Sequence, residues 1–111
     1  MPMSKTELED VLNELEKYRG RQTELITVYV PAGQNIYTVV DQLEAEKSTA
    51  KNIKSTATRK NVSDALDKVA RQLKNYKKTP ENGVALFCGN ISKTEGQSDL
   101  QLWEIIPPMP L

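Results

Sequence analysis

Apolar side chains return every third or fourth position in three stretches of the chain, which is the spacing of one helical face. The first stretch follows a capping box at residues 4–7 and stops before Gly20. The third stretch is the longest and carries basic residues on or beside its polar face. The pattern therefore predicts helices over residues 5–18 and 35–46, and a longer helix from residue 60 to about residue 76.

Three shorter stretches have the composition or the alternation of β-strands. Residues 25–30 predict a strand that stops at a proline and that we place at the centre of a sheet. After a turn at residues 79–83, residues 84–88 predict a buried strand. Residues 93–97 predict a hairpin turn into an alternating strand over 100–106. Together these elements predict an α+β fold, in which about three helices cover a small, partly antiparallel sheet.

Residues 47–58 have no long apolar pattern but offer Ser, Thr, Asn and Lys in quick succession. We interpret them as a loop or an irregular helix junction ahead of the longest helix. The chain of 111 residues is expected to form a single domain. Its apolar, proline-rich end at residues 107–111 is typical of a connection cut before its next element, so we expect a fragment of a longer, multidomain protein.

The composition excludes several kinds of site, because the chain has no histidine and one cysteine. A Ser-His-Asp or Cys-His nucleophilic centre is impossible, and the usual zinc ligands and any internal disulfide are missing. We therefore expect no catalytic residue, no metal site and no cofactor. Cys88 is expected to be a small buried hydrophobe, and Trp103 a residue of the core or of a sheet edge. No apolar run approaches the length of a membrane helix, which predicts a cytoplasmic setting without membrane contact.

The charge is zero overall but is divided unevenly along the chain. Residues 47–78 hold ten basic and two acidic side chains, a net charge of +8, so the remainder sums to −8. A positive block of this density attracts polyanions, whereas the alternative is a solvated helix surface that only keeps the protein soluble. The side chains expected to neutralise phosphates are Lys47, Lys51, Arg59, Lys60, Arg71 and Lys74.

The residues just ahead of the longest helix have the chemistry to read unpaired bases. A lysine ammonium donates to the carbonyl oxygens of uracil, whereas cytosine presents an amino donor at the corresponding place. A glutamate instead accepts from the amino group of adenine or from N1 and N2 of guanine. The alternative is that Asn52 or Ser55 caps the helix and the lysines are simply exposed.

A family resemblance enters at this loop. The run of residues 49–55, Thr-Ala-Lys-Asn-Ile-Lys-Ser, resembles the TASNIKS motif of class 1 peptide chain release factors of the archaeal and eukaryotic type. Its NIKS core is present unchanged, although Lys51 stands where serine is usual and Ser48 where glycine is usual. Segments 26–31, 73–76, 80–83 and 87–91 occur in the same order as in the amino-terminal, codon-recognition domain of that family. The resemblance therefore covers nearly the whole chain.

The resemblance implies translation termination, with recognition of a stop codon of messenger RNA beside ribosomal RNA in the A site of the small ribosomal subunit. The intact factor would promote peptidyl-tRNA hydrolysis through a separate domain that holds a Gly-Gly-Gln motif. Another domain would bind a class 2 release factor or an elongation-factor-like GTPase. The Glu-Gly-Gln at residues 95–97 is given no catalytic role, because it lies in a predicted reverse turn.

The resemblance also implies roles for particular residues. Asn52 and Lys54 would read the first uridine with support from Thr49, and Glu46 would read the following purines. The family's Gly-Thr-Ser element aligns with residues 22–24, of which only the threonine is retained. A second decoding element, Tyr-x-Cys-x-x-x-Phe, would fall after residue 111, and Tyr29 and Cys88 cannot replace it because both are expected to be buried. The full set expected at the message is Thr23, Glu46, Thr49, Asn52, Ile53, Lys54 and Ser55.

Two other functions stay open on the sequence. A general RNA-binding or ribosome-associated interaction module would use the same positive surface without reading a codon. A protein-interaction domain would offer its lysines to an acidic partner. An enzyme is the least supported, because no paired constellation of reactive side chains is visible.

Overall fold

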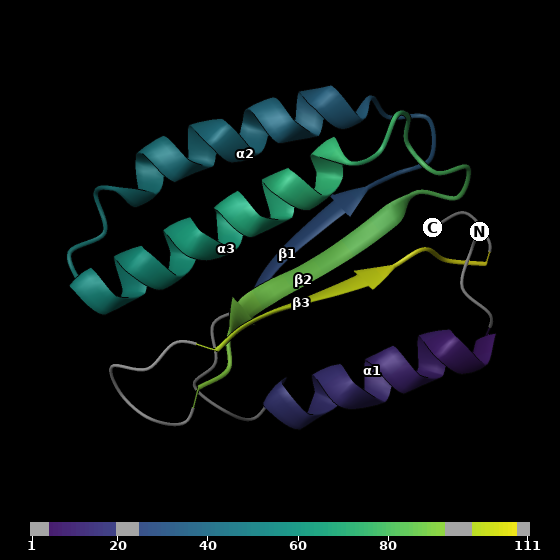
Figure 1. Cartoon of the computed structure of the whole chain (residues 1–111), viewed down its shortest axis with the longest axis horizontal. Helices are drawn as coiled ribbons and strands as arrows, with labels where there is room; N and C mark the ends of the chain where they lie inside the picture. Colours follow the sequence, from purple (N-terminus) through teal and green to yellow (C-terminus); the bar gives the residue numbers. More distant parts are fainter. Residues whose placement is uncertain (1–4, 20–24, 93–98, 109–111) are drawn as a thin grey trace.

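The computed structural model describes residues 5–19, 25–92 and 99–108. In chain order these residues form α1 (Lys5–Arg19), β1 (Leu25–Val30), α2 (Ile36–Ala50), α3 (Thr56–Lys74), β2 (Val84–Asn90) and β3 (Leu100–Ile105), as Figure 1 shows. The α+β prediction is confirmed. Thr23 and the rest of the 22–24 element lie outside the described residues, as does the predicted hairpin turn at 93–97.

The strands form one antiparallel sheet in the order β1-β2-β3. The expectation that β1 is central is wrong, because β2 pairs with both neighbours. The composition of the two strands gives the physical reason. β2 is apolar on both faces, and Val84, Ala85, Leu86 and Cys88 are all buried, whereas β1 alternates and exposes Thr27 and Tyr29.

The helices lie on opposite sides of the sheet (Figure 1). α3 packs against all three strands and most closely against β2, α2 packs against α3, and α1 contacts β3 on the other side. Val30, Leu73 and Leu86 are fully buried between α3 and the sheet. As a result the loop between α2 and α3 lies at one end of the helix pair, and the turn from α3 to β2 lies at the other.

The helix boundaries differ from the predicted ones around the candidate loop. α2 continues to Ala50, and α3 begins at Thr56, so the predicted loop of residues 47–58 shrinks to residues 51–55. Ser48 and Thr49 are weak helix formers, so the sequence pattern does not predict this last turn of α2. The turn is helical because Ala50, only 4% exposed, is buried in the core. Glu46, Lys47 and Thr49 are therefore helical residues.

Three further expectations concern individual side chains. Cys88 is fully buried and Trp103 is 8% exposed, so both predictions are confirmed. The prediction that Tyr29 is buried is wrong, since its side chain is 41% exposed on the edge strand.

None of the helices that the structure describes combines the length and the apolar character that crossing a bilayer requires.

The turn before β2 depends on Gly83. Its backbone has a φ of 86°, and a Cβ built there would lie 2.6 Å from the carbonyl oxygen of Val30. Only glycine can therefore bring this turn so close to the end of β1. The turn at residues 80–83, which the sequence predicts, is also closed by a hydrogen bond from the Gly83 amide to the Pro80 carbonyl at 2.9 Å.

Candidate nucleic-acid interface

The candidate loop starts with a tight turn at the end of α2. The Asn52 amide donates to the Thr49 carbonyl at 3.0 Å, and the Ile53 amide donates to the Ala50 carbonyl at 3.1 Å. These short-range bonds satisfy carbonyl groups that the helix end would otherwise leave without a partner. The backbone is thereby ordered up to the middle of the NIKS sequence.

The second half of the loop is fixed by the start of α3. The Ser55 side chain accepts from the Thr58 amide at 3.2 Å, which makes Ser55 the N-cap of the helix. The Arg59 guanidinium reaches back to donate to the Ile53 carbonyl at 3.3 Å. The sequence alternative, in which Ser55 caps the helix, is therefore correct, and this cap coexists with an exposed loop.

The side chains of the loop alternate in direction. Ile53 is half-buried and packs against the hydrophobic core. Asn52 and Lys54, on either side of it, are exposed. The core contact of Ile53 thus holds the loop down, while an amide and an ammonium group face solvent. Of the predicted message contacts, Ile53 and Ser55 have structural tasks; the sequence offered the Ser55 cap as an alternative but gave no sign of the Ile53 core contact.

Glu46 and Thr49 stand on the last turn of α2, three residues apart on one helical face. Both are exposed. The Thr49 hydroxyl donates to the Ala45 carbonyl at 3.4 Å, so its oxygen remains available as an acceptor. Glu46 and Thr49 therefore stand on the last turn of α2, which leads directly into the loop that carries Asn52 and Lys54.

Most of the predicted phosphate-neutralising residues already have a partner within the protein. Lys47 lies 3.2 Å from Asp67 and 3.8 Å from Glu44. Arg71 pairs with Asp67, Lys74 lies 3.7 Å from Glu44, and Lys60 lies 2.7 Å from Asp64. An ion-pair network, formed by Glu44, Lys47, Asp67, Arg71 and Lys74, thus joins α2 to α3. Part of the positive charge counted along the sequence is neutralised locally.

Asp67 is the centre of the network. Its hydrogen bond with Arg71, followed by that with Lys47, holds the pKa of the Asp67 carboxyl below its ordinary value. Glu44 is not among the residues predicted from the sequence, because it lies just before the charge block. The spacing Glu44–Lys47 and Asp67–Arg71 was the available signal, since oppositely charged residues three or four positions apart on a helix are neighbours.

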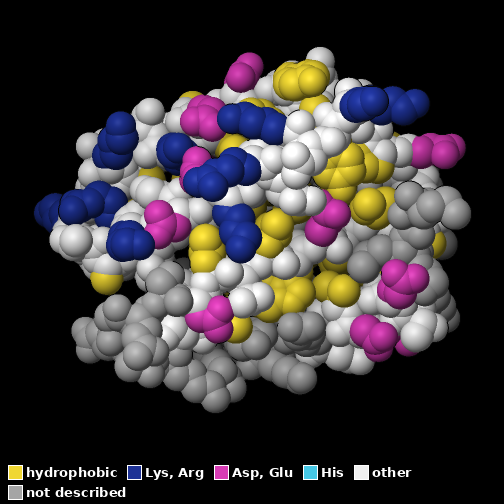
Figure 2. Space-filling model, in the orientation of Figure 1, with side chains coloured by type: hydrophobic (Ala, Val, Ile, Leu, Met, Phe, Trp, Pro, Cys, Tyr) yellow, Lys and Arg dark blue, Asp and Glu magenta, His cyan; other side chains and the backbone are white. Residues whose placement is uncertain are grey.

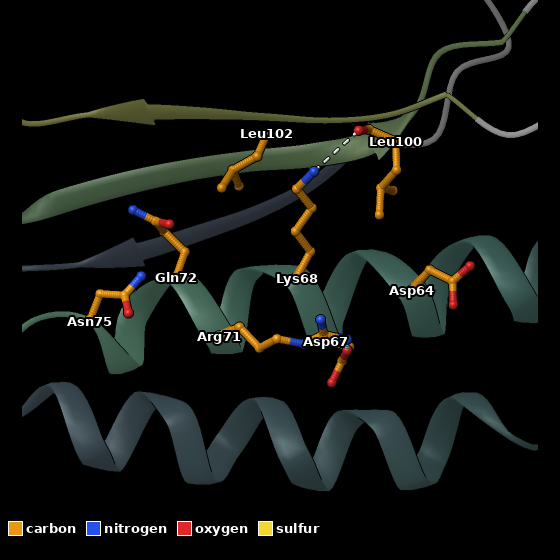
Figure 3. Close-up of a pocket in the computed structure, with 8 residues that line it drawn as sticks. All are labelled: Asp64, Asp67, Lys68, Arg71, Gln72, Asn75, Leu100 and Leu102. Carbon is orange, nitrogen blue, oxygen red and sulfur yellow. Dashed lines mark hydrogen bonds and ion pairs between the residues drawn. The ribbon is translucent and has the colours of Figure 1, made fainter.

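A groove of about 500 Å³ runs between α3 and β3, and Figure 3 shows that polar side chains of α3 line it. Lys68 donates to the Leu100 carbonyl at 3.3 Å, the dashed contact in the figure. Gln72 donates to the Glu104 carboxylate at 2.9 Å. Burial raises the pKa of the Tyr76 hydroxyl, and the hydrogen bond between this hydroxyl and the Glu104 carboxylate raises it further. These polar groups are occupied in holding α3 on the sheet.

After this pairing, two of the predicted cations at the loop end are left without a partner. Lys51 and Lys54 are exposed and make no side-chain hydrogen bond or ion pair with any described residue. Figure 2 shows basic side chains gathered over the α2 and α3 side and at the loop end, with acidic side chains interspersed among them. The positive block seen along the sequence is therefore also gathered in space, and it is partly neutralised by neighbouring carboxylates.

The fold and the loop together define a class: an α+β domain that presents exposed polar side chains on a short loop between two helices. The chain belongs to the family described as eRF1 domain 1, whose model matches residues 3–111. The resemblance to the amino-terminal domain of archaeal-type release factors is thereby confirmed.

Relatives with known names agree with this family. The chain is 56% identical over 105 residues to the peptide chain release factor subunit 1 of Thermococcus onnurineus, covering 95% of this chain and 25% of the relative. For the protein of the same name from Archaeoglobus fulgidus the identity is 45% over 101 residues, covering 90% and 24%. A crystal structure of the archaeal translation termination factor aRF1 superimposes with a TM-score of 0.84 at 34% identity, covering 99% of this chain and 30% of that one. The chain thus spans about a quarter of the length of the curated relatives it matches.

Proposed function

We propose that this domain recognises stop codons of messenger RNA in the A site of the small subunit of the cytoplasmic ribosome, and that Asn52 and Lys54 read the first uridine. The observation that carries the proposal is the alternation in the loop, in which Ile53 packs inward and both readers face solvent. The Lys54 ammonium supplies donors for the carbonyl oxygens of uracil, and the Asn52 amide supplies both a donor and an acceptor.

The neighbouring turn of α2 supports the reading of the following bases. The exposed Glu46 carboxylate can accept from the amino groups of purines, and the Thr49 oxygen can accept a further hydrogen bond. Ser55 and Ile53 contribute by fixing the loop. Among the predicted phosphate contacts, Lys51 is the one with a fully available ammonium group, while Lys47, Lys60, Arg71 and Lys74 would have to leave a carboxylate. Thr23 stays in the proposal on the resemblance alone.

The proposed role is binding, as one domain of a longer factor. Peptidyl-tRNA hydrolysis and the contact with a class 2 release factor or an elongation-factor-like GTPase would belong to other domains of that factor. Ribosomal RNA is the proposed neighbour of the message in the A site. The lysine-rich surface would then add affinity without sequence information, and the loop would add discrimination.

A release assay on reconstituted archaeal ribosomes tests the first-base assignment. In a factor that carries this domain, Lys54→Ala is expected to lower the rate of release about tenfold at all three stop codons, because all begin with uridine. Lys60→Ala is the matched control, since Lys60 is also exposed but is paired with Asp64.

The first codon base provides the second arm of this assay. Exchange of the first uridine for cytidine should abolish most release by the unaltered factor. In the Lys54→Ala variant, the ratio of the release rate at the uridine codon to the release rate at the cytidine codon should move towards one. Equal release at uridine and cytidine by the unaltered factor would instead favour the general RNA-binding module.

A further inference from the structure

Two more lysines are left without a partner, and they lie at the far end of the helix pair. Lys77 and Lys78 lie in the connection from α3, which ends at Lys74, to β2, and both are exposed. Neither ammonium group makes a hydrogen bond or an ion pair within the part of the chain that the structure describes. They differ in this from Lys47, Lys60, Arg71 and Lys74, each of which has a carboxylate within 4.0 Å.

These lysines line a hollow of about 400 Å³ between the start of α2 and the turn that leads to β2. The other lining residues that matter here are Gln34, Tyr37, Thr79 and Glu81. The Thr79 hydroxyl donates to the Gln34 carbonyl, and this contact ties the two walls together. Glu81 is the one acidic residue of the lining, and the first turn of α2 contains no acid, so the hollow has a net positive charge.

Tyr37 adds an aromatic surface to the hollow. Its side chain is 57% exposed, the largest exposure among the large hydrophobic residues of the described chain. An exposed ring beside two available ammonium groups has the two elements of a single-stranded nucleic-acid site, because a base stacks on the ring and the lysines neutralise the flanking phosphates. An acidic peptide would satisfy the lysines but would leave the ring without a stacking partner.

We infer that this hollow is a second RNA-binding site, which binds the sugar-phosphate backbone through Lys77 and Lys78 and stacks an unpaired base on Tyr37. α2 has 15 residues and is therefore about 22 Å long, and it separates the hollow from the NIKS loop. The site carries no codon information. It goes beyond the proposed function, because it adds a second point of attachment to RNA, supplied either by ribosomal RNA or by the backbone of the message.

The first test measures the affinity of the 111-residue chain for archaeal small ribosomal subunits over a range of salt concentrations. In the double variant Lys77→Ala/Lys78→Ala, the slope of log affinity against log salt is expected to become shallower by about 1.4–1.8, since each phosphate contact contributes about 0.7–0.9. The comparison variant is Lys60→Ala/Lys74→Ala, which removes two paired lysines and should change the slope less than the Lys77→Ala/Lys78→Ala variant does. An unchanged slope in the Lys77/Lys78 variant overturns the inference.

The second test separates stacking from charge. Tyr37→Ser is expected to weaken binding about fivefold or more while leaving the salt slope unchanged, because the ring carries no charge. Tyr29→Ser is the control, since Tyr29 is also exposed but lies on β1, away from the hollow. Equal binding by the two tyrosine variants contradicts the role of Tyr37. Thermal unfolding of every variant verifies that these surface changes leave the fold intact.

Small subunits with and without bound message distinguish the two sources of RNA. If the Lys77→Ala/Lys78→Ala variant shows a shallower salt slope than the unaltered chain in both preparations, the site binds ribosomal RNA. If its slope is shallower only when message is present, the site binds the message backbone. A photocrosslinker on Glu81→Cys, the one accessible thiol of the described residues because Cys88 is buried, should attach to RNA. Attachment only to a ribosomal protein overturns the inference. The Lys77→Ala/Lys78→Ala variant is expected to keep the preference for uridine at the first codon position in the release assay. A failure of this second site would therefore leave the proposed codon reading untouched, and the reverse also holds.

Discussion

A basic side chain can contribute to RNA binding only to the extent that the protein itself does not already engage it. Lys54 and Lys60 are close in sequence and both exposed, yet Lys60 lies 2.7 Å from the Asp64 carboxylate and Lys54 has no described partner. For Lys60, binding a phosphate means exchanging one anion for another, so the net gain is small. Under the proposed function, the recognition role would therefore fall on the side chains that have no partner within the folded protein.

The cap of α3 gives a prediction for a single residue. Ser55→Ala removes the acceptor of the Thr58 amide and is expected to lower the free energy of unfolding by about 1 kcal/mol. Ser55→Asp should restore most of that loss, because aspartate is an equally good N-cap residue. Urea denaturation of the three proteins measures the difference. Equal stability of the serine and alanine forms would show that the cap contributes nothing to the fold.

The sequence predicted the exposed residues of the site better than their partners. Asn52 and Lys54 could be placed on a loop because no apolar periodicity passes through them. Their neighbour Ile53 could not be assigned to the core, since one apolar residue in a polar run has no period. The Lys47–Asp67 contact was equally out of reach, because it joins residues 20 positions apart through the packing of two helices.

At the scale of elements, the candidate site belongs to the pair α2 and α3. The two helices meet through buried residues such as Leu43, Ala50 and Leu66, and the ion-pair network of Glu44, Lys47, Asp67, Arg71 and Lys74 covers their outer side. The NIKS loop is the short connection at the end of this pair. The packing of α2 against α3 therefore fixes the position of the loop.

The ion-pair network predicts a pH dependence of stability. Since the folded protein lowers the pKa of Asp67, the stabilisation is fully present above the pKa of an unfolded aspartate, about 4, and is lost as the pH falls through the lower folded value. Asp67→Asn is expected to lower the melting temperature by about 1–5 °C at pH 7. The difference from the unaltered chain should shrink below pH 4.

Asp64→Asn serves as the control for this measurement at pH 7. Asp64 has a single exposed partner on its own helix, whereas Asp67 joins α3 to α2, so the control should shift the melting temperature less. A difference between the unaltered chain and Asp67→Asn that stays constant down to the lowest pH would show that the Asp67 charge does not stabilise the fold.

Element types were predictable from local pattern, and their arrangement was only partly so. The alternation of β1 identified a strand, yet its position at the sheet edge became clear only from the pairing with β2. The last turn of α2 was missed because its stability comes from burial of Ala50 and not from local propensity. In both places the deciding contacts are with residues far away in sequence.

At the scale of the whole molecule, the lysines of the described part that have no partner lie at the two ends of the α2 and α3 pair, Lys51 and Lys54 at one end and Lys77 and Lys78 at the other. This arrangement predicts how the domain behaves when the ribosome is absent. Short RNA should bind weakly and with a steep salt dependence, because phosphate contacts dominate, and codon preference should be slight because the ribosome supplies the geometry of the message.

Fluorescence anisotropy with short oligonucleotides that contain a stop or a sense codon measures this. Affinities for the two oligonucleotides should agree within about twofold at each salt concentration. Lys51→Ala is the informative variant, since removal of this available ammonium group should make the salt slope shallower by about 0.7. Tight binding to the stop codon alone that ignores salt would refute this description of the domain.

Under the proposed codon reading, the inward packing of Ile53 would affect the accuracy of decoding. The placement of Asn52 and Lys54 depends in part on the core contact of Ile53, the half-buried side chain between them, in addition to the backbone hydrogen bonds of the loop. Warming or a conservative core exchange that loosens this contact would shift both recognition groups together. Misreading errors of the factor would then rise well before the domain unfolds, with no altered residue touching the codon.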